Sequence, residues 1–184
     1  MRVADLFSIL NAAFGFLALY YNNPSLIFLA AFADGMDGYL ARKYGSGSFG
    51  KNLDTLADFI SFGVAPTYFL GVFAFPYLIA SIYRLARFLN VSKEDFIGFP
   101  VTSSAMIVVP LFYFSKELSL LASVILSFFM VSSIEYRKVK DVKLLALAAA
   151  LILLAFAHPK LSVGILILSI LYLLSPLAKN LYKH

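Results

Sequence analysis

Four aspartates lie inside or at the edge of two neighbouring apolar stretches of this chain: Asp34, Asp37, Asp54 and Asp58. A carboxylate at the centre of a membrane-spanning helix costs about 2.5–3.5 kcal/mol on insertion scales, so four together need a compensating partner. Helical spacing puts Asp34 and Asp37 on one face of the first stretch and Asp54 and Asp58 on one face of the second. Because a short loop joins the stretches, we expect them to run antiparallel, with the carboxylates in one cleft.

Clustered carboxylates repel one another unless a cation holds them together. Ligands that are all oxygen favour hard divalent ions such as Mg²⁺ or Mn²⁺, and Mg²⁺ keeps coordination positions free for substrate phosphates. Two other interpretations stay open. A structural ion-pair cluster would need bases in similar number, but only Arg42 and Lys51 flank the aspartates. The same carboxylates could also line a proton or cation pathway.

The composition indicates a membrane protein. Apolar residues make up 61% of the 184 residues and charged residues 14%, against about 45–50% and about 25% in an ordinary soluble domain. Cysteine is absent and the two histidines are far apart, which excludes disulfides, thiolate zinc sites and a multi-histidine metal site within one chain. The net charge of +5 comes from basic residues that lie between apolar stretches. This pattern favours a membrane surface over nucleic acid as the partner.

The hydropathy pattern predicts an all-α, polytopic helical bundle, formed by residues 1–184 as a single domain. About eight segments have roughly the length of a membrane span. They cover residues 6–21, 24–41, 53–73, 75–90, 99–114, 117–133, 143–157 and 160–177. With a cytoplasmic N-terminus, thirteen lysines and arginines fall on the cytoplasmic side and only Lys116 and Lys160 on the other. This bias predicts that both termini and the aspartate cleft face the cytoplasm.

The pattern Asp34-x-x-Asp37-Gly38-x-x-Ala41-Arg42, followed after eight residues by Gly50-x-x-x-Asp54-x-x-x-Asp58, resembles the signature of the CDP-alcohol phosphotransferases. The resemblance implies transfer of a phosphatidyl-type group from a CDP-linked lipid to an alcohol, with release of CMP. It also implies a six-helix core, here with two helices added. Further segments are similar to the bacterial and archaeal phosphatidylserine synthase branch. These are residues 5–11, 61–66, 84–88 and 96–100.

The resemblance assigns roles to the motif residues. It implies that Asp34, Asp37 and Asp54 bind Mg²⁺ or Mn²⁺, as one or two ions. Asp58 is implied as the general base that takes the hydroxyl proton of the acceptor, with a further metal ligand as the alternative role. The residues expected at the CDP-lipid are Asp34, Gly38, Ala41, Arg42, Gly50 and Lys51.

Two arginines are candidates for binding the acceptor. Arg84 and Arg87 lie at positions i and i+3 near the cytoplasmic end of the fourth segment. Arginine binds carboxylates through two parallel hydrogen bonds, and serine carries a carboxylate. Anchoring at the membrane interface is the alternative role for this pair.

The predicted reaction is that of a CDP-diacylglycerol or CDP-archaeol serine O-phosphatidyltransferase, with L-serine as the acceptor. The protein is expected to work in the cytoplasmic membrane, and the resemblance implies a homodimer. Within the same family, the alternative acceptors are glycerol-3-phosphate and an inositol phosphate. Either would need a denser basic pocket than serine does. The alternative from another class is a cation transporter that uses the carboxylates as an ion site, and such a protein would release no CMP.

Overall fold

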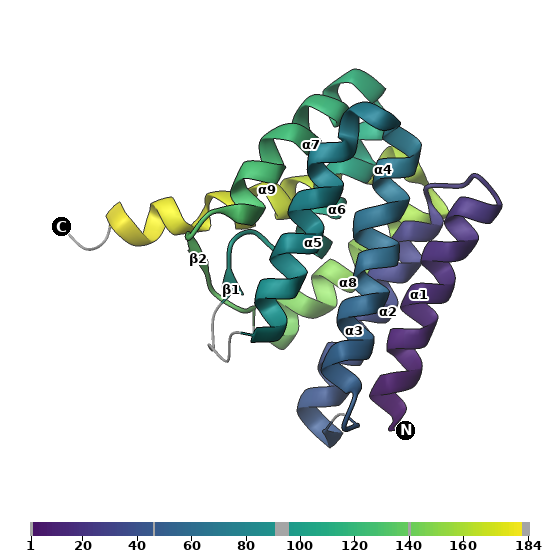
Figure 1. Cartoon of the computed structure of the whole chain (residues 1–184), viewed down its shortest axis with the longest axis vertical. Helices are drawn as coiled ribbons and strands as arrows, with labels where there is room; N and C mark the ends of the chain where they lie inside the picture. Colours follow the sequence, from purple (N-terminus) through teal and green to yellow (C-terminus); the bar gives the residue numbers. More distant parts are fainter. Residues whose placement is uncertain (1, 46, 91–95, 140, 182–184) are drawn as a thin grey trace.

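The computed structural model describes residues 2–45, 47–90, 96–139 and 141–181, with side chains up to residue 177. Within these ranges the chain is a helical bundle with one very short pair of strands (Figure 1). The α-helices are α1 (Val3–Tyr20), α2 (Leu26–Tyr44), α3 (Gly50–Asp58), α4 (Ala65–Leu70), α5 (Phe75–Asn90), α6 (Val101–Phe112), α7 (Lys116–Val131), α8 (Val142–Ala157) and α9 (Val163–Leu181). The prediction of an all-α fold is confirmed.

Helix α1 packs against both α2 and α3, so the first three helices form one side of the bundle (Figure 1). The face of α1 that points into the bundle is partly polar, and small residues lie where this face comes closest to the neighbouring helices. The buried residues of this face are Ala4, Asp5, Ser8, Asn11, Gly15 and Ala18. Apart from the adjacent Ala4 and Asp5, they are spaced by three or four residues, which keeps them on one face of the helix.

Helices α3 and α4 are joined by a π-helical turn, η1 (Phe59–Val64), so the chain is helical from residue 50 to residue 70. The π-helical turn begins directly after Asp58. Its central residues Ser61, Phe62 and Gly63 are all buried. Such wide turns within α-helices occur frequently at functional sites.

Two short strands, β1 (Phe96–Ile97) and β2 (Glu135–Tyr136), pair antiparallel at the ends of α5 and α7. They were not predicted from the sequence. Tyr136 is buried and its ring packs against Phe99 and Tyr172 of α9, with centroids 5.2 and 5.7 Å away. The pairing therefore joins the α5–α6 connection to the α7–α8 connection and to the C-terminal helix.

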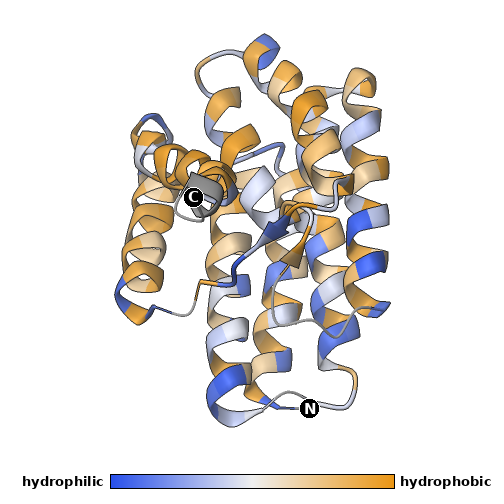
Figure 2. Ribbon diagram, turned by 90° about the vertical axis from the view of Figure 1, so that its left-hand side faces the viewer, coloured by the Kyte–Doolittle hydropathy of each residue, from blue (hydrophilic) through white to orange (hydrophobic). Residues whose placement is uncertain are grey.

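Each of the eight predicted apolar segments overlaps a helical region. By length and composition, three helical stretches among the described residues could each cross a membrane: Val3–Tyr20, Val72–Asn90 and Pro159–Leu177. The second begins with a 3₁₀ turn, η2 (Val72–Ala74), and the third with another, η3 (Pro159–Leu161). Shorter apolar helices cover Val101–Phe112 and Val142–Ala157. The helices are largely hydrophobic, and many hydrophilic residues lie toward the end of the bundle that carries the N-terminus (Figure 2). These features are those of a membrane protein.

Candidate active site

Three carboxylates from two helices converge in the structure. Asp34 comes from α2, and Asp54 and Asp58 come from α3. One oxygen of each lies within 4.8 Å of an oxygen of the other two. Asp58 is buried and the other two are half-buried. The Oδ1 atom of Asp54 is buried and has no hydrogen-bond partner in the described part of the chain.

Asp37 lies one helical turn from Asp34 and is also buried. It is not part of the close group of three, but its carboxylate lies beside that of Asp54. Its Oδ2 accepts a 2.6 Å hydrogen bond from the hydroxyl of Ser8. All four predicted aspartates therefore meet between α2 and α3.

Helix α1 contributes two polar side chains that the sequence analysis did not assign to the site. Ser8 contacts Asp37, and Asn11 donates from Nδ2 to Oδ1 of Asp58 over 3.0 Å. Both are buried. The available signal was their spacing, because polar residues at i and i+3 in an otherwise apolar helix mark one face that has polar neighbours. Thr102 of α6, which the sequence analysis did not assign either, lies beside Asp34.

Arg84 supplies a positive charge next to the carboxylates. It is only 5% exposed and interacts electrostatically with Asp34, Asp54 and Asp58. Its guanidinium carbon lies 5.4 Å from the ring centroid of Phe88 and 5.1 Å from that of Phe96. The Nε atom is buried and has no hydrogen-bond partner among the described residues. Arg84 is therefore a buried cation that has rings on its flank and unused hydrogen-bonding capacity.

Arg87 is placed differently. Its guanidinium donates to four backbone carbonyls at 2.8 to 3.1 Å, all from β1 and from the end of α7. The acceptors belong to Ile97, Met130, Val131 and Ser132. A side chain added at Gly98 would overlap both Arg87 and the Met130 carbonyl, and Gly98 has a φ of +77°. The guanidinium of Arg87 therefore ties β1 to the end of α7.

The residues predicted to bind the nucleotide lie along α2 and at the start of α3. Gly38 and Ala41 are partly buried, Arg42 is exposed, and Gly50 is buried at the first position of α3. An Arg42 nitrogen lies 3.6 Å from the point that a Cβ of Gly38 would occupy, so the guanidinium folds back over this glycine. Lys51 donates to the carbonyl of Leu89 and lies 4.9 Å above the Phe88 ring. Arg42 interacts electrostatically with Asp37, whereas the ammonium of Lys51 reaches the end of α5.

The aspartate cluster fits a divalent metal. Its donors are carboxylate oxygens, which Mg²⁺ and Mn²⁺ prefer. The unpartnered Oδ1 of Asp54 is a donor atom available to such an ion. The geometric group includes Asp58 and leaves out Asp37, so an oxygen of Asp58 lies among the candidate metal ligands.

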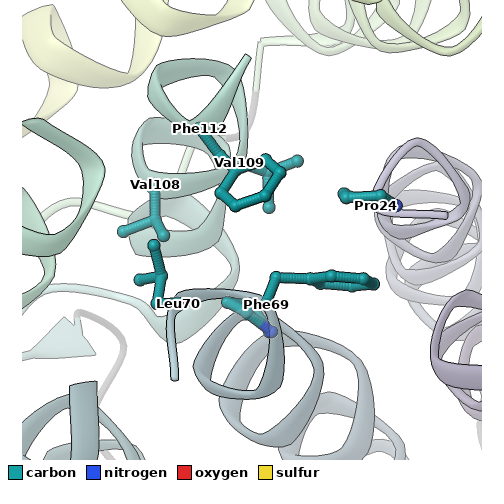
Figure 3. Close-up of a pocket in the computed structure, with 7 residues that line it drawn as sticks. Pro24, Phe69, Leu70, Val108, Val109 and Phe112 are labelled. Atoms are coloured by element: carbon teal, nitrogen blue, oxygen red, sulfur yellow. The ribbon is translucent and has the colours of Figure 1, made fainter. Parts of the chain in front are cut away.

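A small pocket between α4 and α6 has no part in this chemistry. It is lined by apolar residues, among them Pro24, Phe69, Leu70, Val108, Val109 and Phe112 (Figure 3). Pro24 belongs to the α1–α2 turn and Leu70 ends α4, so the pocket lies toward the end of the bundle opposite the aspartates. It has no polar group that could bind a nucleotide.

The chain is similar to known proteins over most of its length. The family model described as CDP-alcohol phosphatidyltransferase matches residues 1–176. The chain is 34% identical to a CDP-diacylglycerol–serine O-phosphatidyltransferase of Methanocaldococcus jannaschii, over 75% of each chain. It is 32% identical to an archaetidylserine synthase of Methanothermobacter thermautotrophicus, over 76% of this chain and 71% of that relative. A Bacillus subtilis protein with the same name as the first is 35% identical, over 64% of this chain and 77% of the relative.

Proposed function

Because the chain belongs to the CDP-alcohol phosphatidyltransferase family, we propose that it transfers the lipid phosphate of a CDP-linked lipid to the hydroxyl of L-serine. The products are phosphatidylserine or archaetidylserine, according to the lipid, and CMP. Bacterial and archaeal relatives carry names for this reaction. The observation that carries the proposal is the convergence of Asp34, Asp54 and Asp58 beside the buried Arg84.

The reaction replaces the phosphoanhydride bond of the CDP-linked lipid by a phosphate ester bond to serine. The serine hydroxyl oxygen forms a bond to the phosphorus that carries the lipid, and the bond from this phosphorus to the oxygen of CMP breaks. Asp58 takes the hydroxyl proton, and CMP leaves with the electron pair of the broken bond. A buried carboxylate that accepts one hydrogen bond from Asn11 still has a second oxygen for this proton.

A divalent cation fits the same cluster. Asp34, Asp37 and Asp54 would hold Mg²⁺ or Mn²⁺, and Asp58 would contact a second ion if two are bound. When bound, such an ion polarises the phosphoryl oxygens and neutralises the charge that develops on CMP. The residues themselves position the donor. Gly38, Ala41 and Gly50 leave room for the nucleotide, and Arg42 and Lys51 approach its diphosphate.

Arg84 is proposed to bind the carboxylate of serine. Its burial and its unpartnered Nε support this role, because a desolvated guanidinium forms strong charge-assisted bonds. Arg87 stays a predicted second contact of the acceptor. Its four bonds to backbone carbonyls also support a role in holding β1 in place.

The topology that we propose has eight membrane segments, both termini in the cytoplasm, and the cleft open to the cytoplasm and sideways to lipid. The donor carries two chains that stay in the bilayer, so the cleft must admit it from the side. A homodimer in the cytoplasmic membrane is part of the proposal, supported by helix faces rich in Gly, Ala and Ser.

The test is CMP release by the purified protein. CDP-diacylglycerol and CDP-archaeol are each incubated with L-serine, glycerol-3-phosphate or an inositol phosphate, in the presence of Mg²⁺ or Mn²⁺. We expect serine-dependent CMP release from wild-type protein and its loss in Asp58→Asn. Release with a phosphorylated acceptor alone would replace serine by that acceptor, and no release with any acceptor would contradict the proposal.

A further inference from the structure

Asn11 is buried in the middle of an apolar helix and reaches the site from outside the family signature. It is 0% exposed, and its Nδ2 donates to Oδ1 of Asp58 over 3.0 Å. The two residues are 47 positions apart in the sequence. The contact therefore depends on how α1 is placed against α3 and η1.

That placement is fixed by a close approach between two helices. The hydroxyl of Ser61, in the π-helical turn, donates to the backbone carbonyl of Asn11 over 2.8 Å. One turn further along α1, a Cβ at Gly15 would lie 2.8 Å from the Cα of Ser61, so only glycine permits this distance. The backbone of α1 is therefore held in one position along the helix axis beside Asp58.

The orientation of the Asn11 amide follows from the charge of its neighbour. The Oδ1 atom of Asn11 is buried and has no hydrogen-bond partner among the described residues. Rotating the amide by 180° would bring this oxygen against the carboxylate of Asp58, which is unfavourable. Donation to Asp58 therefore determines the side-chain conformation even though one polar atom stays unpaired.

We propose that Asn11 is a positioning residue for Asp58: it holds one carboxylate oxygen so that the other faces the acceptor hydroxyl. A carboxylate with a single fixed oxygen cannot rotate freely about its Cβ–Cγ bond. A general base needs this alignment, because proton transfer requires hydrogen-bonding geometry to the reacting hydroxyl. The inference rests on the proposed function, in which Asp58 is the base.

The experiment compares Asn11→Leu, which keeps the approximate size, with Asn11→Ala, Asp58→Asn and the double variant Asn11→Leu/Asp58→Asn. Ser123→Ala is the control, because Ser123 is also fully buried in a helix but donates only to Leu120 of its own helix. For each protein kcat and the KM values for serine and CDP-lipid are measured. Binding of Mn²⁺ alone is measured by calorimetry, and the melting temperature in detergent reports folding.

If Asn11 positions the base, either Asn11 variant lowers kcat about ten- to a hundredfold, as other orienting contacts do. Both KM values stay within about twofold of wild type, and the Mn²⁺ dissociation constant rises by a smaller factor than kcat falls, because Asp58 also lies in the metal cluster. In the Asp58→Asn background, the Asn11 substitution lowers the residual rate of CMP release, measured at high enzyme concentration, by less than about twofold. Asn11→Ala gives the same comparison if the bulkier leucine prevents folding.

Three results would overturn the inference. Full kcat in both Asn11 variants would show that Asp58 needs no such contact. If the Asn11 substitution lowers the rate by the same factor in wild type and in Asp58→Asn, Asn11 acts on a group other than Asp58. A loss of Mn²⁺ affinity that matches the loss of kcat would make Asn11 a support of the metal site. The proposed function fails separately, if Asp58→Asn itself retains serine-dependent CMP release.

Discussion

The hydroxyl of Ser8 donates a 2.6 Å hydrogen bond to Oδ2 of Asp37, across 29 residues of sequence. Both side chains are buried, and they come from α1 and α2. The bond fixes the orientation of a carboxylate that lies beside Asp54. Helix α1 is therefore part of the site, although it carries none of the signature aspartates.

We predict that Ser8→Ala weakens metal binding without removing it. A partner that orients a metal-binding carboxylate typically contributes about ten- to a hundredfold in metal affinity. The measurement is a calorimetric titration with Mn²⁺ beside wild type and Ser123→Ala, whose hydroxyl donates only within α7. An unchanged Mn²⁺ titration would remove Ser8 from the metal site.

A second prediction concerns the fit between α1 and η1. A methyl group at position 15 would overlap the Ser61 hydroxyl and lie 2.8 Å from the Cα of Ser61, which can shift only together with the backbone. Gly15→Ala should therefore destabilise the protein by about 1–3 kcal/mol, the usual cost of overpacking. Thermal unfolding in detergent measures the effect.

Gly35→Ala is the matched control for this substitution. It changes a glycine of α2 around which nothing lies within 4 Å, so its melting temperature should stay at or slightly above that of wild type. Equal melting temperatures for Gly15→Ala and Gly35→Ala would mean that α1 can move away from Ser61 without cost.

Much of the fold could be predicted from hydropathy, because apolar segments between polar breaks carry a strong signal. The turn after Tyr20 and the helix end at Gly45 both coincide with predicted breaks. The pairing of β1 with β2 could not be predicted, since two-residue strands have no periodicity. The π-helical turn could not be predicted either, because its sequence also suits an α-helix. It depends on tertiary packing around Ser61 and Gly63.

The four aspartates of the site could be predicted because their helical spacing and their cost in a membrane are both visible in the sequence. Ser8 and Asn11 could not be assigned, since serine and asparagine often serve packing in membrane helices. The different contacts of Arg84 and Arg87 could not be predicted from the sequence either. Both lie near the same helix end, and only the fold brings the carbonyls of β1 and α7 around Arg87.

Removal of divalent metal should abolish transfer. The cluster of Asp34, Asp54 and Asp58 holds three carboxylates close together, and the donor substrate is a diphosphate. Exhaustive chelation should reduce CMP release to background, and Mg²⁺ or Mn²⁺ should restore it. Asp34→Asn and Asp54→Asn should each weaken the Mn²⁺ titration. Full activity after chelation would contradict the metal assignment.

The topology is testable because the protein has no native cysteine. Single cysteines at Asn22, Lys116 and Lys160 should react with an impermeant thiol reagent added outside intact cells. A cysteine at Gly47, in the α2–α3 loop, should react only after the membrane is opened. Labelling of position 47 from outside would reverse the proposed orientation.

The two arginines of α5 give the sharpest test of the acceptor. Arg84 is buried beside Asp58. The Nε atoms of both arginines lack a hydrogen-bond partner among the described residues, but the terminal nitrogens of Arg87 already donate to four carbonyls. Arg84→Ala should raise the KM for serine about ten- to a hundredfold, because a charge-assisted bond contributes about 1.5–3 kcal/mol. It should not reduce the use of ethanolamine, which lacks the carboxylate, so the preference for serine should fall.

Arg87→Ala separates the two roles that are open for this residue. If its bonds mainly hold β1 against α7, the variant should melt at a lower temperature while the KM for serine changes less than in Arg84→Ala. A rise in KM as large as that of Arg84→Ala, without loss of stability, would instead make Arg87 a direct contact of the acceptor. If neither variant alters the dependence on serine, the carboxylate of the acceptor is not recognised by α5, and a phosphorylated or neutral alcohol becomes the substrate to test.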